Sequence, residues 1–307
     1  MELYSGPVQP FEDAELVLLF DCNNMIFRGA KGVVPRHIDL GDFQHRERRQ
    51  TAHLQGFHHL VARAWQEHGE PFKTALVFGF DGRGAKATRQ EIYPAYKVHP
   101  DKPDHFLETL GIPKRQALDD LRGLCSVLPG NLLEREGAEF DDMAYSVIAR
   151  HPKRYVVFST DRDMWALIGR FPGVSVVGQT LVRPSDLTEK FGLLSFRHVA
   201  TFKVLFGDPS DNIPSLLPRL RKRPVVEFLN RLDDPEALPV AHFLARFHAE
   251  VEAARKFIDA PGFRESFYRN QALVWFHWYE PTIDRFTPGD ARALAALDLQ
   301  LGAVPWF

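Results

Sequence analysis

The sequence predicts an α/β fold in which a mostly parallel sheet is flanked by helices and followed by a helical domain. Short apolar runs, typical of strands buried on both faces of a parallel sheet, occur at 16–20, 74–80, 155–160 and 174–177. Helical patterns separate these runs, as expected for strand–helix–strand units. After about residue 184 the pattern becomes helical alone.

These patterns divide the chain into a loose tail at 1–15, an α/β core at 16–183 and a helical domain at 184–307. A chain of 307 residues is long enough for two domains. Its hydrophobic content of 45% and charged content of 25% are ordinary for a globular protein. The formal net charge of −2 argues against a uniformly basic nucleic-acid binder.

The composition also predicts a cytoplasmic location. No apolar run reaches the roughly 18 residues that a membrane-spanning helix requires. Acidic residues and prolines stand where a signal peptide would carry basic and apolar residues. The two cysteines, Cys22 and Cys125, are too few for a disulfide framework, and both are expected to be buried thiols.

The predicted core elements follow in order. The strand at 16–20 ends at Asp21, and a loop with glycine and proline follows. An amphipathic helix at 43–68 leads to the strand at 74–80, which ends at Asp81. Further elements are expected as a helix at 114–128, a strand at 131–136, the strands at 155–160 and 174–177, and helices at 197–206 and 224–231. Because parallel strands end at one edge of the sheet, Asp21 and Asp81 are expected to lie together there.

Five carboxylates are concentrated in the middle of the chain. Glu139, Asp141 and Asp142 open a predicted helix, and Asp161 and Asp163 follow the strand at 155–160. Two like charges about 4 Å apart repel by roughly 4 kcal/mol even at an effective dielectric near 20. The group therefore stays ionised only if cations share it, which predicts a divalent-metal site.

Helix capping is the alternative for these acids, because Asp and Glu are favoured in the first turn of a helix. Acids at other strand ends, and a pair at i, i+3 near residue 210, exceed what capping needs. The predicted metal-binding set is Asp21, Asp81, Glu139, Asp141, Asp142, Asp161, Asp163, Asp208 and Asp211. Ligand sets made only of oxygen suit Mg²⁺ or Mn²⁺ and not zinc.

Basic residues gather in two places. Residues 83–114 interleave Arg83, Lys86, Arg89, Lys97, Lys102 and Lys114 with Tyr93 and Tyr96. This mixture suits a single-stranded or frayed nucleic acid, although an exposed loop of ordinary composition is the alternative. The second group is the compact cluster Arg219, Arg221, Lys222 and Arg223.

The order and spacing of these motifs resemble the 5′-nuclease family, which includes flap endonucleases, phage 5′-3′ exonucleases and the 5′-nuclease domains of bacterial DNA polymerase I. Residues 89–97 are similar to the family pattern R-x-x-x-Y-P-x-Y-K, and residues 139–142 are an altered form of E-A-D-D. Residues 159–163 resemble S-x-D-x-D. The strongest match is that of residues 207–214 to G-D-x-S-D-N-I-P.

The resemblance, which covers about residues 16–230, implies a PIN-like α/β core and a helical DNA-binding domain with a helix-hairpin-helix-type element. It also implies a two-metal phosphodiesterase that hydrolyses DNA at 5′ ends or flaps. It implies a first ion on Asp21, Asp81, Glu139, Asp141 and Asp142, with Asp161 between the two ions. A second ion would be held by Asp163, Asp208 and Asp211. Arg89 and Lys97 would contact the scissile phosphate. The expected protein is a monomer that uses two Mg²⁺ ions, or Mn²⁺ in their place, and it could also accept an RNA primer–DNA hybrid.

Two departures from the family pattern matter for DNA binding. Pro100 stands where a basic residue is expected, and Lys102 is the candidate substitute. The hairpin after residue 214 lacks the expected glycines, so it cannot approach a duplex through its backbone. The predicted DNA contacts are therefore Arg83, Lys86, Tyr93, Tyr96 and Lys102 near the site, and Arg219, Arg221, Lys222 and Arg223 on the duplex. Some phage members share such a hairpin, which favours a phage-type enzyme acting in a host cytoplasm.

Three other functions fit parts of this pattern. A haloacid-dehalogenase-like phosphatase needs a second acid two residues after Asp21, where this chain has Asn23. A PIN-type ribonuclease shares the core but does not need residues 207–214. A DNA-structure-binding protein without activity, or with weak activity, would not need so many mutually repelling carboxylates.

Overall fold

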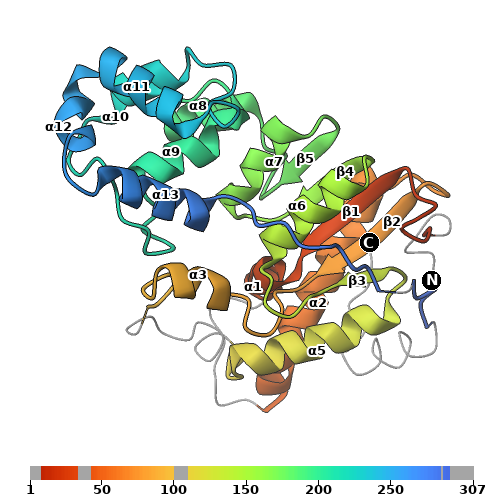
Figure 1. Ribbon diagram of the computed structural model, residues 1–307. Helices are drawn as coiled ribbons and strands as arrows, with labels where there is room; N and C mark the ends of the chain where they lie inside the picture. The colour runs from red at the N-terminus through yellow and green to blue at the C-terminus, as the bar shows by residue number, and fades with distance from the viewer. Residues whose placement is uncertain (1–7, 34–42, 100–109, 285, 291–307) are drawn as a thin grey trace.

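The computed structural model describes residues 8–33, 43–99, 110–284 and 286–290. These residues form an α/β core and a helical domain beside it (Figure 1). The sheet contains five parallel strands in the order β3-β2-β1-β4-β5. The strands are β1 (Leu16–Asp21), β2 (Thr74–Gly79), β3 (Asn131–Leu133), β4 (Arg154–Phe158) and β5 (Val174–Val177). The predicted parallel α/β fold is confirmed.

The strand order creates a switch point beside β1. The chain builds β2 and β3 on one side of β1 and then crosses to build β4 and β5 on the other. Every residue of β1 and β2 is buried, which explains why both read as continuous apolar runs. Asp21 pairs in register with Gly79, so the ends of β1 and β2 meet at one edge. Open α/β sheets place their sites at this edge, next to the switch point.

Helices cover both faces of the sheet (Figure 1). Side chains alternate across β1, so Leu18 and Phe20 pack on one face while Val17 and Leu19 pack on the other. The first face is covered by α1 (Cys22–Val33), α2 (Phe43–His68) and α5 (Lys114–Val127). The second is covered by α6 (Phe140–Arg150) and α7 (Trp165–Arg170). The short helix α3 (Ala87–Ile92) follows β2.

Two parts of the core differ from the sequence prediction. The segment after Asp21 was expected to be a loop, but Cys22–Val33 forms α1, whose Met25 and Ile26 are buried. Residues 8–14 were expected to be part of a loose tail, yet the Phe11 side chain is buried. The backbone N–H of Gln9 also donates to the Thr74 carbonyl oxygen at 2.9 Å. This part of the chain is therefore packed on the core.

The helical domain surrounds a second apolar core that contains Phe202, Phe228 and Phe247. Its α-helices are α8 (Pro184–Phe191), α9 (Val199–Phe206), α10 (Lys222–Leu229), α11 (Val240–Glu250), α12 (Arg255–Ile258) and α13 (Phe263–Val274). Short 3-10 turns occur at Arg162–Met164, Phe196–His198 and Glu252–Ala254. None of the helices in the described part of the chain is long and apolar enough to cross a membrane.

The segment after α13 returns to the α/β core, although the sequence analysis assigned all of 184–307 to the helical domain. The Asp284 N–H donates to the Leu132 carbonyl oxygen at 3.0 Å, and Thr287 pairs with Gly130 in an antiparallel bridge. In Figure 1 this segment runs from α13 along the front of the core. The described part of the chain from 275 onward therefore contacts both domains.

Candidate metal centre

A cavity of about 160 Å³ lies at the carboxyl edge of the sheet, where β1, β2 and β4 end against the start of α6. Its lining consists of Asp21, Asn23, Asn24, Asp81, Lys97, Glu139, Phe140, Asp141, Asp161 and Met164. Five of the nine predicted metal ligands are thus brought together. The prediction that strand ends converge here depended on parallel pairing, which the structure shows.

Asparagines at the start of α1 fix the two strand-end aspartates. Asn23 donates from its side-chain amide to Asp81 at 2.8 Å, and its amide oxygen accepts the Asp81 backbone N–H at 3.1 Å. Asp21 accepts the Asn24 backbone N–H at 3.1 Å and the Ser159 hydroxyl at 2.7 Å. These bonds orient the carboxylates and leave oxygen lone pairs facing the cavity.

The carboxylates at the strand ends carry little compensating charge. Burial, and then the nearby charge of Asp81, raise the pKa of Asp21 to about 8. Burial, with the charge of Asp141 adding to it, also raises the pKa of Asp81. Among the described residues, no lysine or arginine forms an ion pair with Asp21, Asp81 or Asp141. This part of the cavity therefore favours a bound cation.

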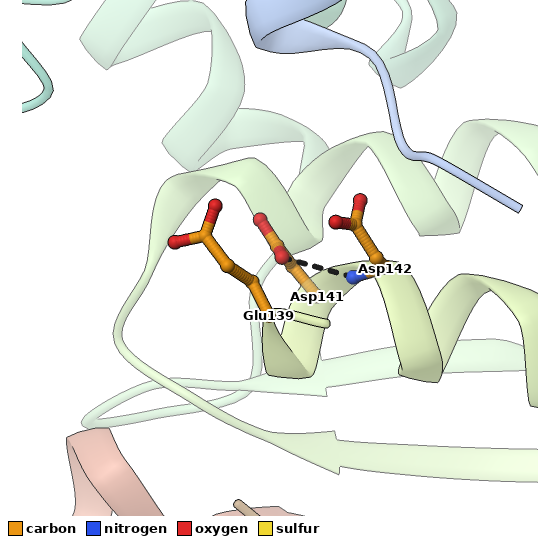
Figure 2. Close-up of side chains that lie close together, drawn as sticks. All are labelled: Glu139, Asp141 and Asp142. Carbon is orange, nitrogen blue, oxygen red and sulfur yellow. Dashed lines mark hydrogen bonds between the residues drawn. The ribbon is translucent and has the colours of Figure 1, made fainter. Parts of the chain in front are cut away.

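Glu139, Asp141 and Asp142 project to the same side from the first turn of α6 (Figure 2). Each offers a carboxylate oxygen, and these oxygens lie within 4.8 Å of one another. Glu139 is the N-cap residue, but its side chain makes no capping hydrogen bond. Asp141 accepts the backbone N–H of Asp142 at 2.9 Å. Capping thus does not explain Glu139, and the alternative weighed for this stretch accounts for Asp141 at most.

Arg89 lies behind these carboxylates and is only 2% exposed. Its guanidinium donates to Glu139 at 2.7 Å and to both oxygens of Asp142 at 2.7 and 2.8 Å. Its Nε donates to the Leu273 carbonyl oxygen at 3.0 Å. Its donors are thus committed inside the protein, and a contact of Arg89 with the scissile phosphate stays a prediction from the sequence.

Asp142 is fully buried and does not line the cavity. Besides Arg89, it accepts the His277 backbone N–H at 2.7 Å. Burial first, and then the charge of Asp141, raise the pKa of Asp142 to about 6. Asp142 thus makes its hydrogen bonds inside the protein, and its direct contact with a metal ion stays a prediction. Sequence patterns gave no sign that residues 273–277 would complete this network.

Lys97 stands at the rim of the cavity as a half-buried cation. Its Nζ donates to Glu139 at 2.6 Å and lies 3.8 Å from an Asp211 oxygen. Burial acts to lower the pKa of Lys97, but the charges of Asp141 and Glu139 outweigh it and raise the pKa. Lys97 is therefore charged at neutral pH, and its contact with a phosphate stays a prediction.

Tyr96, which the sequence predicts to stack on DNA bases, is buried. Its ring is 1% exposed, and its hydroxyl donates to Glu139 at 3.0 Å. Tyr93 is half-buried, with the Arg269 guanidinium over its ring at 5.2 Å. Tyr96 therefore supports the site from within, and its contact with DNA stays a prediction from the sequence.

A second acidic cluster lies where the helical domain meets the core. Asp163, Asp208 and Asp211 offer carboxylate oxygens within 4.8 Å of one another. The loop that carries the latter two begins at Gly207, which has φ of 71°. A Cβ at this position would lie 2.3 Å from the Ile213 carbonyl oxygen, so the turn requires glycine.

Lys203 from α9 enters this second cluster, and the sequence analysis missed it. Its Nζ forms ion pairs with Asp163 and with Asp208, the latter at 2.7 Å. The available signal was a single charge within the apolar run of α9 (Val199–Phe206). A lysine in such a run is buried only when it is paired.

The remaining predicted DNA contacts lie on the surface. Arg83 and Lys86 are exposed and, with Lys114 and Arg115, line a groove of about 790 Å³ that reaches Asp81. Lys102 lies outside the described residues. The basic cluster Arg219, Arg221, Lys222 and Arg223 is exposed around the start of α10.

The segment before α10, which the sequence predicts to be a hairpin without glycine, uses an arginine where a left-handed conformation is required. Arg219 adopts φ of 62°, a left-handed conformation that glycine usually fills. Leu216 and Leu217 pack into the helical core. A groove of about 640 Å³ contains Arg219 and Lys222 and also reaches Asp161 and Asp208. The basic surface and the acidic centre thus share one depression.

A family described as "5′-3′ exonuclease, N-terminal resolvase-like domain" matches residues 16–192. The chain belongs to this family. A thermostable DNA polymerase I of Thermus filiformis is 34% identical over 165 residues, which are 52% of this chain and 18% of the polymerase. Its counterpart in Thermus thermophilus is 32% identical over 210 residues, or 67% of this chain and 23% of the polymerase. The chain thus spans about a fifth of the length of these relatives.

Two solved structures share the fold of this chain. The bacteriophage T5 flap endonuclease, in a complex with DNA and metal ions, aligns with a TM-score of 0.61 and 17% identity. The alignment covers 84% of this chain and 88% of that one. The catalytic core of Rad2 in complex with DNA substrate aligns with a TM-score of 0.52 and 12% identity, covering 96% and 91% of the two chains.

Proposed function

We propose that this protein is a metal-dependent 5′-nuclease that hydrolyses DNA phosphodiesters at 5′ ends or flaps. The observation that carries the proposal is the cavity at the sheet edge, where Lys97 lies at the rim and no lysine or arginine of the described residues forms an ion pair with Asp21, Asp81 or Asp141. Membership of the exonuclease family and the likeness to a flap endonuclease solved with DNA and metal ions support it. A site of this charge is suited to hold cations against a phosphate.

The donor set fits divalent ions that prefer oxygen, so Mg²⁺ is the proposed cofactor and Mn²⁺ its substitute. Asp21, Asp81, Glu139, Asp141 and Asp161 would hold the first ion, with Asp142 as a support. Asp163, Asp208 and Asp211 would hold the second. When bound, such ions supply activation of water and neutralisation of phosphate charge.

The protein's own residues position this chemistry. Asn23 and Asn24 hold Asp81 and Asp21 at the strand ends. Lys97 presents a fixed positive charge at the rim, where it would stabilise the charge that develops on the phosphate in the transition state. Because Glu139 orients the Lys97 ammonium at 2.6 Å, this charge needs little reorganisation during the reaction.

The grooves suggest how DNA is held. The exposed cluster Arg219, Arg221, Lys222 and Arg223 would contact duplex phosphates, while Arg83 and Lys86 would contact the 5′ strand beside Asp81. We further propose that the protein acts as a monomer in the cytoplasm and accepts RNA primer–DNA hybrids as well as DNA.

Cleavage of 5′-labelled flap and 5′-recessed duplex substrates tests the function. We expect cleavage with Mg²⁺ and none with EDTA. Asp141→Asn should reduce the rate by about 10²–10³-fold, the scale on which charged transition states lose a stabilising group. Glu189→Gln, an exposed change on α8, is the matched control and should keep full activity. Undiminished cleavage by Asp141→Asn would overturn the assignment of the cavity.

The role of the basic cluster has its own test. Each phosphate contact that is lost lowers the salt dependence of binding, so Arg221→Ala with Lys222→Ala should reduce the slope of log K against log salt by roughly one to two units. Fluorescence anisotropy of a labelled duplex in Ca²⁺ would measure this. The pair Arg246→Ala with Lys256→Ala, on other helices of the domain, is the control. An unchanged slope in the first pair would remove duplex binding from this cluster.

A further inference from the structure

The second acidic cluster contains an internal cation. Lys203 is 8% exposed, and its ammonium forms ion pairs with Asp163 and Asp208. The carboxylate oxygens of Asp163, Asp208 and Asp211 lie within 4.8 Å of one another, so the ammonium contacts two members of one small group of oxygens. It stands where a divalent ion held by that group would have to bind.

Lys203 changes the electrostatics of this cluster. Burial would raise the pKa of Asp208, but the charge and hydrogen bond of Lys203 outweigh it and lower the pKa. Asp211 makes no ion pair with Lys203, and burial raises its pKa to about 6. The carboxylates that Lys203 touches are therefore already neutralised, unlike Asp21 and Asp81 in the first cavity.

The Lys203 ammonium can also reach the neighbouring basic groove. Lys203 also lines the groove of about 640 Å³ that contains Arg162, Arg219 and Lys222. A lysine has a flexible four-carbon stem, so its ammonium can leave the carboxylates by rotation about side-chain bonds without movement of α9. In the groove, a DNA phosphate would be its natural partner.

We propose that Lys203 is a built-in counterion that a second divalent ion must displace, so that the two metal sites fill in sequence. The first site fills at low ion concentration, and the second fills when the Lys203 ammonium moves into the groove. A phosphate bound in the groove would stabilise the displaced ammonium, so DNA and the second ion would favour each other's binding. This inference rests on the proposed function, because it describes how the same centre is loaded.

Binding of Mn²⁺ to the free protein, followed through the electron paramagnetic resonance signal of unbound Mn²⁺, tests the proposal. The wild type should bind one ion at low concentration and a second at least about tenfold more weakly. Lys203→Met should tighten the second step by about tenfold, equivalent to ~1.4 kcal/mol, and leave the first unchanged. Lys190→Met, an exposed change on α8, should resemble the wild type. An unchanged or weaker second step in Lys203→Met would overturn the proposal.

A second variant and a second measurement keep the proposal testable if Lys203→Met does not fold. Lys203→Gln keeps hydrogen-bond donors without the charge and should also tighten the second step. Thermal unfolding should show that Mn²⁺ stabilises either variant more than it stabilises the wild type, because only the variants leave Asp163 and Asp208 without a cation. Equal stabilisation would count against the proposal. These titrations contain no DNA, so their outcome is separate from whether the protein cleaves DNA.

Discussion

The two sides of the acidic centre handle negative charge in different ways. On the sheet side, Asp21 and Asp81 are held by asparagines and backbone groups and have no cationic partner among the described residues. On the other side, cations are part of the protein: Arg89 joins Glu139 to Asp142, and Lys203 joins Asp163 to Asp208. Carboxylates with a cation of their own are stable without metal, whereas those without one gain most from a bound ion.

The largest expected effect comes from removing a built-in cation. Arg89→Met should destabilise the metal-free protein by about 3–5 kcal/mol, because it leaves two buried carboxylates without their partner. Urea unfolding in EDTA measures this, with exposed Arg115→Met as the control expected to change stability by less than about 0.5 kcal/mol. If Arg89→Met has normal stability but does not cleave DNA, the result would instead support the predicted contact of Arg89 with the scissile phosphate.

On the sheet side, removing a carboxylate is expected to stabilise the metal-free protein. The pKa of Asp21 rises from 3.8 to about 8 on folding, so the folded state binds this proton more tightly than the unfolded state. The resulting stability is full below pH 4 and is lost as the pH rises toward 8, by up to about 1.4 kcal/mol per pH unit. At pH 7 without metal, Asp21→Asn should therefore be more stable than the wild type by roughly 2 kcal/mol.

Unfolding of both proteins in EDTA from pH 5 to 8 checks this expectation. The difference between wild type and Asp21→Asn should widen as the pH rises, and saturating Mg²⁺ should reverse it, since only the wild type keeps the ligand. A difference that stays constant over this range would mean that the pKa of Asp21 is not raised on folding.

The smallest expected effect is a difference in stability between variants of Asp208 and of Asp211 in the second acidic cluster. Asp208→Asn removes the partner that Lys203 holds at 2.7 Å and should cost about 1 kcal/mol at pH 7 without metal. Asp211→Asn removes a carboxylate whose pKa is raised by burial to about 6, so it should be neutral or slightly stabilising. Thermal unfolding of the two variants in EDTA compares them. The reverse order of stability would contradict the role given to Lys203.

The sequence predicted the features that depend on local pattern. The apolar runs located β1, β2, β4 and β5, and parallel pairing then placed Asp21 and Asp81 together. It did not predict α1, because glycine and proline further along suggested a loop while the helical residues lie directly after Asp21. The burial of Arg89 was not predicted, because it depends on Leu273 and Trp275, more than 180 positions away. Such partners have no signature in the local sequence.

The residues after α13 also bear on how the centre forms. The Leu273 and Trp275 carbonyl oxygens accept from Arg89, and the His277 N–H donates to Asp142. A chain emerging from the ribosome has already made all nine carboxylates by residue 211, but it lacks these contacts until about 66 residues later. The acidic centre therefore becomes complete only after residue 277 has been made, and a fragment that stops at residue 192, where the family match ends, would lack the two carbonyl acceptors at 273 and 275 that bind Arg89.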